Sequence, residues 1–460
     1  MRSRLNPRIL LFACALWLPG IAAAQDTTPP TAQPQGGETP AGQPQSGETP
    51  AAATGSTDAD ANTGTVSEQP LSIFGDAMSG HLAFSGEADA RYEYDDNVLA
   101  SNVFRFSDNI TNISGRLSAA VQKKKLQFQI HYAPSYRIYA DLDERNAFSH
   151  QFANEIEYRF GARTTLRWAG LVSDMSTSAS PPFSFASFGG TIIAIYHPSA
   201  LQTDTRVLHS NGSLGLEHNF TARSGVHVTA HGATTNFFEE NNVPLVNSRA
   251  REQFSSGATA GWNYEYVQGK KVGVEAGYSY YGFLEPAAHS NYEFIKLRYE
   301  RLLGKGFSFR VGAGPSFQQS QSALKKNNIS YDIDVSLARQ TAKYNVVLAY
   351  NKGNRLGSAQ GTLTTDQASI VVGSSFRRRW NTTGSFGYSR SSQPQLRSQN
   401  LESISTSAQL GYALSPTLRA YTQYSFVNQF GRSGLFSLYN FDRSVFAFGI
   451  GYSFGAAARR

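Results

Sequence analysis

The chain has 460 residues, of which 16% are charged and 12% are aromatic, and it contains 41 Gly and 23 Tyr with a formal net charge of +7. The charged fraction lies well below the ~25% typical of soluble domains, and no apolar run reaches the ~18 residues of a membrane helix. The mean hydropathy is nevertheless −0.35. This composition is typical of strands with one apolar and one polar face, as in a transmembrane antiparallel up-and-down β-barrel.

Residues 1–24 have the three parts of a secretory signal peptide. The basic residues are Arg2, Arg4 and Arg8, the apolar stretch is Ile9 to Leu18, and the small residues before the expected cleavage site are Ala22, Ala23 and Ala24. We expect the mature chain to begin at Gln25. Cys14 is the single cysteine of the sequence, so the mature chain is expected to have neither disulfides nor thiolate chemistry.

Residues 25–70 are predicted to be a disordered linker rich in Pro, Gln and Thr. A near-repeat, QPQGGETPA followed by QPQSGETPA, falls in this segment, and such stretches cannot bury apolar area. The linker contains no Lys or Arg, and its acidic residues are Asp26, Glu38, Glu48, Asp58, Asp60 and Glu68. Residues 71–460 are therefore basic. The secretion signal excludes nucleic acid as the partner of this positive charge, and we expect no such partner.

From His81 onward apolar residues alternate with polar ones, which predicts a β-barrel over residues 71–460. In the first segment Leu82, Phe84, Tyr92 and Tyr94 share one face. About 18 such segments follow one another, with about 16 as the alternative count, and short connections alternate with long ones. Asn154 is one mismatch on a predicted lipid face. An even count places the linker and the C-terminus together, in the periplasm of a Gram-negative bacterium, with the barrel in its outer membrane.

The last predicted strand, Phe446 to Phe454, ends in an apolar pattern marked by Gly449, Tyr452 and Phe454. This ending resembles the signal by which bacterial outer-membrane proteins are recognised by the outer-membrane assembly machinery. The resemblance implies that machinery as a partner. The sequence departs from the signal because Gly-Ala-Ala-Ala-Arg-Arg follows Phe454.

The first strand leaves through Tyr94-Asp95-Asp96-Asn97 followed by Val-Leu. This motif and the layout from Leu71 to Phe454 resemble the β-barrel porin 2 family of bacterial outer-membrane proteins. The resemblance implies a porin-like barrel, and some relatives are associated with exopolysaccharide production. Asp95 and Asp96 are candidates for holding a divalent cation near lipopolysaccharide, and the alternative is that Asp-Asp-Asn caps a turn.

A barrel of this size has a lumen too wide for wall side chains to fill. The insertion at 173–207 is long and apolar, and it contains the aromatic residues Phe183, Phe185, Phe188 and Tyr196. A loop of this length in a compact protein is usually functional. We expect it to fold into the lumen as a constriction; the alternative is a hairpin that lies over the barrel mouth.

The inward register predicts pore-lining residues of both charge signs. They are Glu87, Asp89, Arg91, Arg116, Glu155, Arg159, Arg167, Lys296, Arg298, Arg310, Asp332, Asp334 and Arg419. Mixed charge predicts weak ion selectivity, and the net charge of the barrel tips it mildly towards anions. Each of these residues could equally pair with a neighbouring strand across the wall.

Three functions remain open: a diffusion porin for small hydrophilic solutes, an exopolysaccharide export or secretion-associated barrel, and a structural or adhesive barrel with a closed lumen. The tripeptides His209-Ser210-Asn211 and His289-Ser290-Asn291 lack the spacing of outer-membrane hydrolases, so an enzyme is not expected. We also expect no metal and no cofactor. Outer-membrane lipid and lipopolysaccharide are the expected surroundings, and the oligomeric state stays open between monomer and trimer.

Overall fold

The computed structural model describes residues 82–455 with gaps in the connections. The gaps are 101, 103–104, 177–182, 189–190, 197–205, 239–252, 284–287, 305, 321–325, 342, 358–360, 377–378, 393–399 and 432–439. The predicted signal peptide and linker, and the C-terminal residues 456–460, lie outside the described residues and remain predictions.

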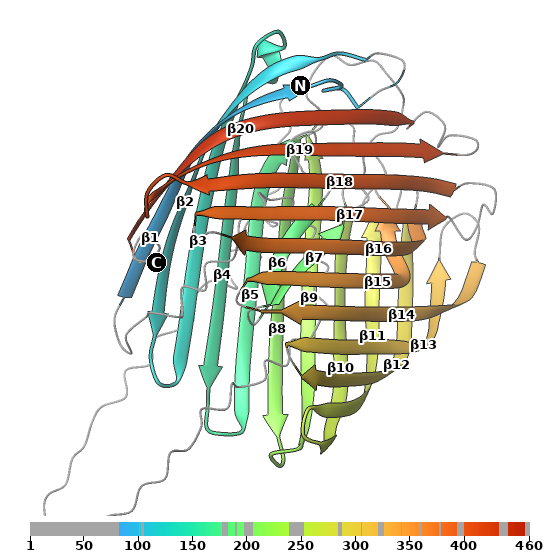
Figure 1. Ribbon diagram of the computed structural model, residues 1–460. Helices are drawn as coiled ribbons and strands as arrows, with labels where there is room; N and C mark the ends of the chain where they lie inside the picture. Colours follow the sequence, from blue (N-terminus) through green and yellow to red (C-terminus); the bar gives the residue numbers. More distant parts are fainter. Residues whose placement is uncertain are drawn as a thin grey trace, which may run out of the picture. The chain divides into compact units, whose positions relative to one another are not determined.

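Eighteen strands form one closed antiparallel sheet (Figure 1). In chain order its strands are β1 (Leu82–Asp95), β2 (Asp108–Gln122), β3 (Leu126–Tyr139), β4 (Ala147–Arg159), β5 (Thr164–Ser176), β8 (Arg206–Asn219), β9 (Ser224–Phe238), β10 (Gln253–Val267), β11 (Lys270–Phe283), β12 (Ala288–Gly304), β13 (Phe307–Ser320), β14 (Lys326–Gln340), β15 (Tyr344–Gly357), β16 (Gly361–Phe376), β17 (Trp380–Ser392), β18 (Asn400–Ala413), β19 (Leu418–Gly431) and β20 (Phe441–Gly455). Each pairs with its neighbour along this order, and β20 returns to pair with β1. The predicted fold class and the count of 18 are confirmed.

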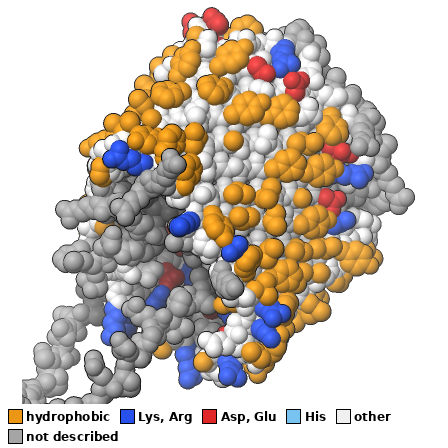
Figure 2. All heavy atoms as spheres, in the orientation of Figure 1, with side chains coloured by type: hydrophobic (Ala, Val, Ile, Leu, Met, Phe, Trp, Pro, Cys, Tyr) orange, Lys and Arg blue, Asp and Glu red, His pale blue; other side chains and the backbone are white. Residues whose placement is uncertain are grey.

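The two faces of the sheet differ in chemistry along every strand. On β1, Phe84 is 63% and Tyr92 is 55% exposed, whereas the alternate residues Glu93 and Asp95 are 3% and 0% exposed. Figure 2 shows apolar side chains covering much of the outer surface in view. Because the backbone is closed on itself, an apolar outer face suits lipid and leaves the polar face inside. Among the described helices none is long and apolar enough to cross a membrane.

The mismatch at Asn154 persists in the structure, and the neighbouring strand accommodates it. Asn154 of β4 pairs with Gly170 of β5 on the apolar outer face. The amide oxygen of Asn154 lies 2.7 Å from the point where a Cβ on Gly170 would stand. A residue larger than glycine at position 170 would therefore collide with this side chain.

The connections alternate in length, as the sequence predicts. Tight turns such as the one after Gln122, closed by hydrogen bonds between the backbones of Lys123 and Leu126 (2.7 and 3.3 Å), join the strands at one end of the barrel. The longer connections, including a 3-10 turn at Asp143–Arg145, lie at the other end. We call these the short-turn end and the long-connection end.

The insertion between β5 and β8 differs from its predicted bounds. β5 continues to Ser176 and β8 begins at Arg206, so both ends of the predicted loop at 173–207 belong to the wall. Within it β6 (Phe183–Phe188) and β7 (Thr191–Tyr196) form a separate two-stranded sheet. Cα atoms of β7 come within 8 Å of Cα atoms of β15 and β16. Since those strands lie across the closed order from β5 and β8, the hairpin crosses the barrel interior or its mouth.

Candidate functional site

The candidate site is the inner face of the wall. The strand register places all the predicted pore-lining residues on this face, opposite the exposed apolar side chains. On β1 to β5 they are Glu87, Asp89, Arg91, Arg116, Glu155, Arg159 and Arg167, and on the later strands Lys296, Arg298, Arg310, Asp332, Asp334 and Arg419. Most of them form ion pairs with one another or with residues that the sequence analysis did not single out.

One cluster of charges lies towards the long-connection end of β1, β3 and β20. The carboxylate of Glu93 lies 2.6 Å from Arg91 Nη2 and 3.0 Å from Arg137 Nη2. Arg443 of β20 pairs with Asp95 of β1, with Nε at 2.9 Å from Oδ2. Sequence reasoning missed Arg137 and Arg443. The period-two alternation, continued to the ends of β3 and β20, is the signal that places them inside.

A second cluster spans β9, β11, β12 and β14. The side chain of Glu275 is 1% exposed. Its Oε2 atom forms an ion pair with Arg298 Nη1 at 2.7 Å and lies 3.3 Å from His227 Nε2. Lys296 Nζ lies 3.5 Å from both Asp332 and Asp334 and 4.4 Å from the centre of the Phe294 ring. Buried charges are tolerated when they are paired in this way.

A third set of pairs lies nearer the short-turn end. Glu157 lies 2.8 Å from Arg159 and 3.2 Å from Arg167, and Arg167 is also 3.4 Å from Glu217 of β8. Farther round the wall, Arg310 and Glu300 are 3.6 Å apart. Charges of both signs thus neutralise one another along the inner face, and neither sign dominates the described wall.

A different kind of inner surface covers β16 to β18. Its inward residues are uncharged, and the short ones include Thr365, Ser385, Ser389, Ser391, Ser403 and Ser405, each no more than 6% exposed. Their hydroxyls bond across strands, with 2.9 Å between Ser389 and Ser403 and 2.6 Å between Ser385 and Ser407. Short inward side chains on other strands, such as Ser279 and Ser316, are buried to a similar degree.

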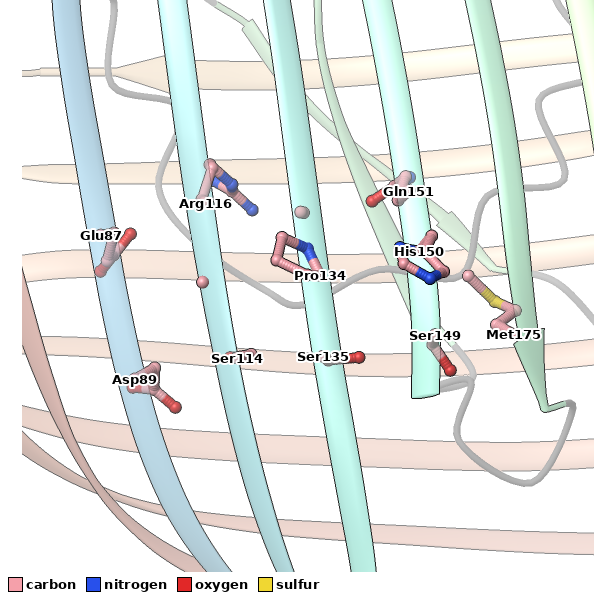
Figure 3. A pocket seen from close by; sticks show the side chains of 12 residues that line it. Glu87, Asp89, Ser114, Arg116, Pro134, Ser135, Ser149, His150, Gln151 and Met175 are labelled. Carbon is pink, nitrogen blue, oxygen red and sulfur yellow. The ribbon is translucent and has the colours of Figure 1, made fainter. Parts of the chain in front are cut away.

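A hollow opens on the inner face of β1 to β5 (Figure 3). Its residues include Glu87, Asp89, Arg116, Gln151 and Met175. Three serines, Ser114, Ser135 and Ser149, cross it on successive strands. The β2–β3 ladder is interrupted here, because no pairing joins the two strands between Ser114–Ser135 and Leu117–Tyr132, although the register is the same on both sides. Pro134 lies in this interval and has no N–H to donate to the ladder.

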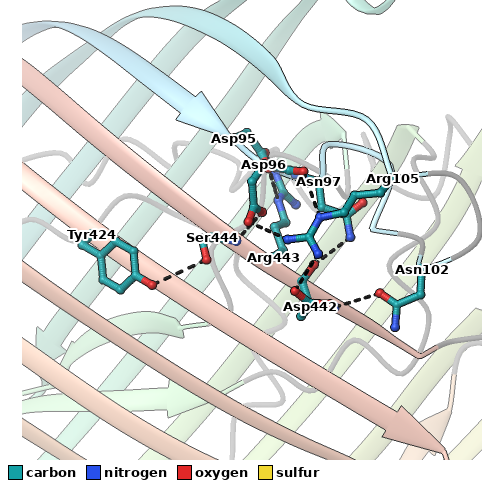
Figure 4. A network of polar contacts seen from close by, with 9 residues as sticks. All are labelled: Asp95, Asp96, Asn97, Asn102, Arg105, Tyr424, Asp442, Arg443 and Ser444. Atoms are coloured by element: carbon teal, nitrogen blue, oxygen red, sulfur yellow. Dashed lines mark hydrogen bonds and ion pairs between the residues drawn. The ribbon is translucent and has the colours of Figure 1, made fainter.

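The motif Tyr94-Asp95-Asp96-Asn97 joins the first strand to the last (Figure 4). Asp95 and Asn97 are both fully buried. Asp96 accepts hydrogen bonds from Arg105 Nη2 and from the backbone N–H of Ser444, each at 2.7 Å. Asn97 donates its side-chain amide to the carbonyl of Asp442 at 2.7 Å. We call this network the seam latch.

The seam latch contains the turn cap that the sequence allowed, since the backbone N–H of Asn97 donates to Asp95 Oδ1 at 3.1 Å. Both carboxylates of the motif are bound by protein groups in this structure. Arg105 lies between β1 and β2, and its hydrogen bond to Asp96 raises the pKa of Arg105. Among the described residues no cluster of His, Cys, Asp or Glu is arranged to hold a metal ion.

The three residues of the predicted assembly signal lie on β20 beside the β1 seam. Tyr452 and Phe454 point outward, 48% and 42% exposed, with ring centres 6.4 Å apart. Gly449 points inward, and the ring of Tyr421 lies where a Cβ on Gly449 would stand. Recognition of these residues by assembly machinery stays a prediction. The aromatic residues predicted for the constriction fall on β6 and β7, where only the backbone is described.

Comparisons with known proteins find no matching family model and no matching curated protein. Among solved structures, Pseudomonas aeruginosa OccK2 (OpdF), crystallised with glucuronate, aligns with a TM-score of 0.43 and 10% identity over 82% of this chain and 100% of that one. The P. aeruginosa outer membrane protein OpdK gives 0.42 and 10% over 82% and 99%. Acinetobacter baumannii OccAB4 gives 0.44 and 10% over 83% and 100%. The class of this protein, a transmembrane β-barrel, rests on its own closed strand order and apolar outer face.

Proposed function

We propose that this protein is a channel in the outer membrane of a Gram-negative bacterium through which small hydrophilic solutes pass passively. The observation that carries the proposal is a sealed wall that is apolar outside and polar inside. A wall of 18 strands encloses more space than its own side chains fill. Paired charges and hydroxyls on its inner face give that space a surface that water wets.

The two ends of the barrel have different surroundings in this proposal. β1 begins, and β20 ends, at the short-turn end, which we assign to the periplasm. The long-connection end then meets lipopolysaccharide and the medium. The assembly machinery of the outer membrane would meet β20 during insertion. No catalytic role is proposed.

Charge selectivity is proposed to be weak, because the inner charges are paired. A mild preference for anions would come from the short-turn mouth. The described cations of its turns are exposed and have no acidic neighbour in the same turn: Lys123, Lys124, Lys125, Arg163, Arg223, Lys343 and Arg379. A ring of one sign at a channel mouth raises the local concentration of the opposite ion.

The β6–β7 hairpin is proposed to constrict the channel. One observation supports this: β7 approaches β15 and β16 from across the barrel. The same observation favours one alternative, a barrel whose lumen the hairpin closes and whose role is structural or adhesive.

Single-channel recording in planar bilayers tests the proposal. We expect the native protein to give discrete current steps, and a variant with residues 177–205 replaced by a short Gly-Ser connection to give larger ones. A silent native protein with a conducting variant would support the closed barrel. Two silent proteins, both shown to be folded, would contradict the channel, and a strong cation preference in a salt gradient would contradict the proposed selectivity.

A further inference from the structure

The hollow on β1 to β5 has a row of polar side chains that follows the strand register. Asp89 pairs with Ser114, Ser114 with Ser135, and Ser135 with Ser149. Adjacent strands lie about 4.8 Å apart. Three hydroxyls are thus spaced evenly across the wall beside the carboxylate of Asp89, and Met175 of β5 also lines the hollow.

The three serines differ from those of β16 to β18 in how their hydroxyls are used. Ser114, Ser135 and Ser149 are half-buried, and none of their hydroxyls bonds another described residue. The hydroxyls of Ser389 and Ser403, by contrast, bond each other at 2.9 Å. A hydroxyl that bonds no described residue and faces the lumen is available to a solute as both donor and acceptor.

The charges around the hollow balance. Glu87 is held by Arg419 at 2.6 Å, and Asp89 accepts a hydrogen bond from Tyr421 at 2.7 Å. Arg116 supplies a second guanidinium group next to Glu87 in the register. Two carboxylates and two guanidinium groups leave no net charge to favour an ion of either sign.

The remaining chemistry of the hollow fits a sugar or polyol. Carboxylates are strong acceptors for hydroxyl donors, Arg116 and Gln151 supply donors, and serine hydroxyls do both. The side chain of Met175 adds apolar surface to this polar floor. A solute with several vicinal hydroxyls and exposed C–H groups would meet partners of both kinds.

We propose that the hollow on β1 to β5 is a binding subsite for neutral polyhydroxylated solutes, with the serine row Ser114, Ser135 and Ser149 as its specific contact. The inference rests on the proposed channel function, since it names the class of solute that the channel would hold in transit. An uncharged sugar should bind there better than a chain of similar size without vicinal hydroxyls.

Sugar-dependent block of the ionic current tests the subsite. We expect sucrose to reduce the native current at lower concentration than poly(ethylene glycol) of similar hydrodynamic size. The triple variant Ser114→Ala, Ser135→Ala, Ser149→Ala should conduct ions normally while its half-blocking sucrose concentration rises at least tenfold. The matched control, Ser385→Ala, Ser389→Ala, Ser403→Ala, should keep the native value. Equal block of both triple variants would overturn the proposal.

A second measurement does not depend on conductance. In the Ser135→Cys variant, sucrose should slow modification of the new thiol by a charged thiosulfonate reagent several-fold, and poly(ethylene glycol) of similar size should not. Unchanged rates with sucrose would overturn the subsite. If sucrose slowed modification in a protein that carries no current, the subsite would be supported and the channel function contradicted. The failure of one proposal is thus distinguishable from the failure of the other.

Discussion

Two parts of the inner wall carry serines that are paired on adjacent strands, and the hydroxyls of these serines differ in their hydrogen bonds. On β17 and β18 the serines face one another across the strands and bond in pairs, and Ser389 is 1% exposed. On β2, β3 and β4 the serines stand in a row beside Asp89, where the β2–β3 ladder is interrupted, and their hydroxyls bond no other described residue. Polar groups that hydrogen-bond each other stabilise the wall, whereas polar groups that bond no other described residue can bind a solute.

In the seam latch, the carboxylate of Asp95 is fully buried and is bonded by Arg443 of the wall. Removing Arg443 should therefore lower the free energy of unfolding more than any other change considered below. Arg443→Met leaves the carboxylate of Asp95 buried without its guanidinium group, which costs about 3–5 kcal/mol. Urea unfolding in lipid vesicles, followed by tryptophan fluorescence, measures this loss.

Arg105→Met is the matched control for Arg443→Met. It also breaks ion pairs of the seam latch, to Asp96 and Asp442, but the Arg105 side chain is 47% exposed. Water screens exposed pairs and they contribute little to stability, so we expect a much smaller loss than for Arg443→Met. Equal losses in the two variants would contradict the claim that burial makes the Asp95–Arg443 pair important.

Gly449→Val tests the link between the satisfied wall and the hollow. A valine side chain at this position would collide with the Tyr421 ring, whose hydroxyl bonds Asp89 at 2.7 Å. Overpacking of this kind costs about 1–3 kcal/mol. We expect a matching loss of stability together with weaker sucrose block. If sucrose blocked the destabilised variant as well as it blocks the native protein, Tyr421 would have no influence on binding in the hollow.

The serine comparison itself predicts a smaller difference. Ser389→Ala removes a buried hydrogen bond to Ser403 and should cost about 1 kcal/mol. Ser135→Ala removes no described hydrogen bond, and its unfolding free energy should stay within about 0.5 kcal/mol of the native value. Urea midpoints of the two variants measure both effects, and a reversed order would break the comparison.

The smallest expected effect concerns the short-turn mouth. Replacing Lys123, Lys124 and Lys125 by Gln removes exposed charge and should shift the reversal potential in a salt gradient slightly towards cations. The shift should vanish at about 1 M salt, where the screening length is about 3 Å. If the reversal potential of the variant at low salt equalled that of the native protein, the ion selectivity would come from the inner wall and not from these lysines.

The sequence predicted the wall better than the contacts on it. Alternation along single strands sufficed for the barrel, the number of strands and the inward side of residues such as Glu87 and Arg419, because the side-chain period of a strand is local. Which charges pair depends on the register after closure. Asp95 and Arg443 are far apart in the chain and meet only because β20 returns to β1.

The insertion and the motif show the same limit. The apolar content of residues 173–207 indicated that this segment has a structural role, but its hairpin and the extension of β5 to Ser176 depend on the pairing of β5 with β8. The Asp-Asp-Asn motif was predicted as a cap or a cation site. Its main partners, Arg443 and Ser444, belong to the last strand, which no local pattern could indicate.

The most direct test of the central claim, that alternate residues of each strand meet water and lipid, is thiol labelling along β1. Single cysteines at positions 87 to 92 would be treated with a charged, membrane-impermeant maleimide in the folded protein in vesicles. We predict fast labelling of the cysteines that replace Glu87, Asp89 and Arg91, and slow labelling of those that replace Ala88, Ala90 and Tyr92. Uniform labelling, or the opposite alternation, would contradict the account.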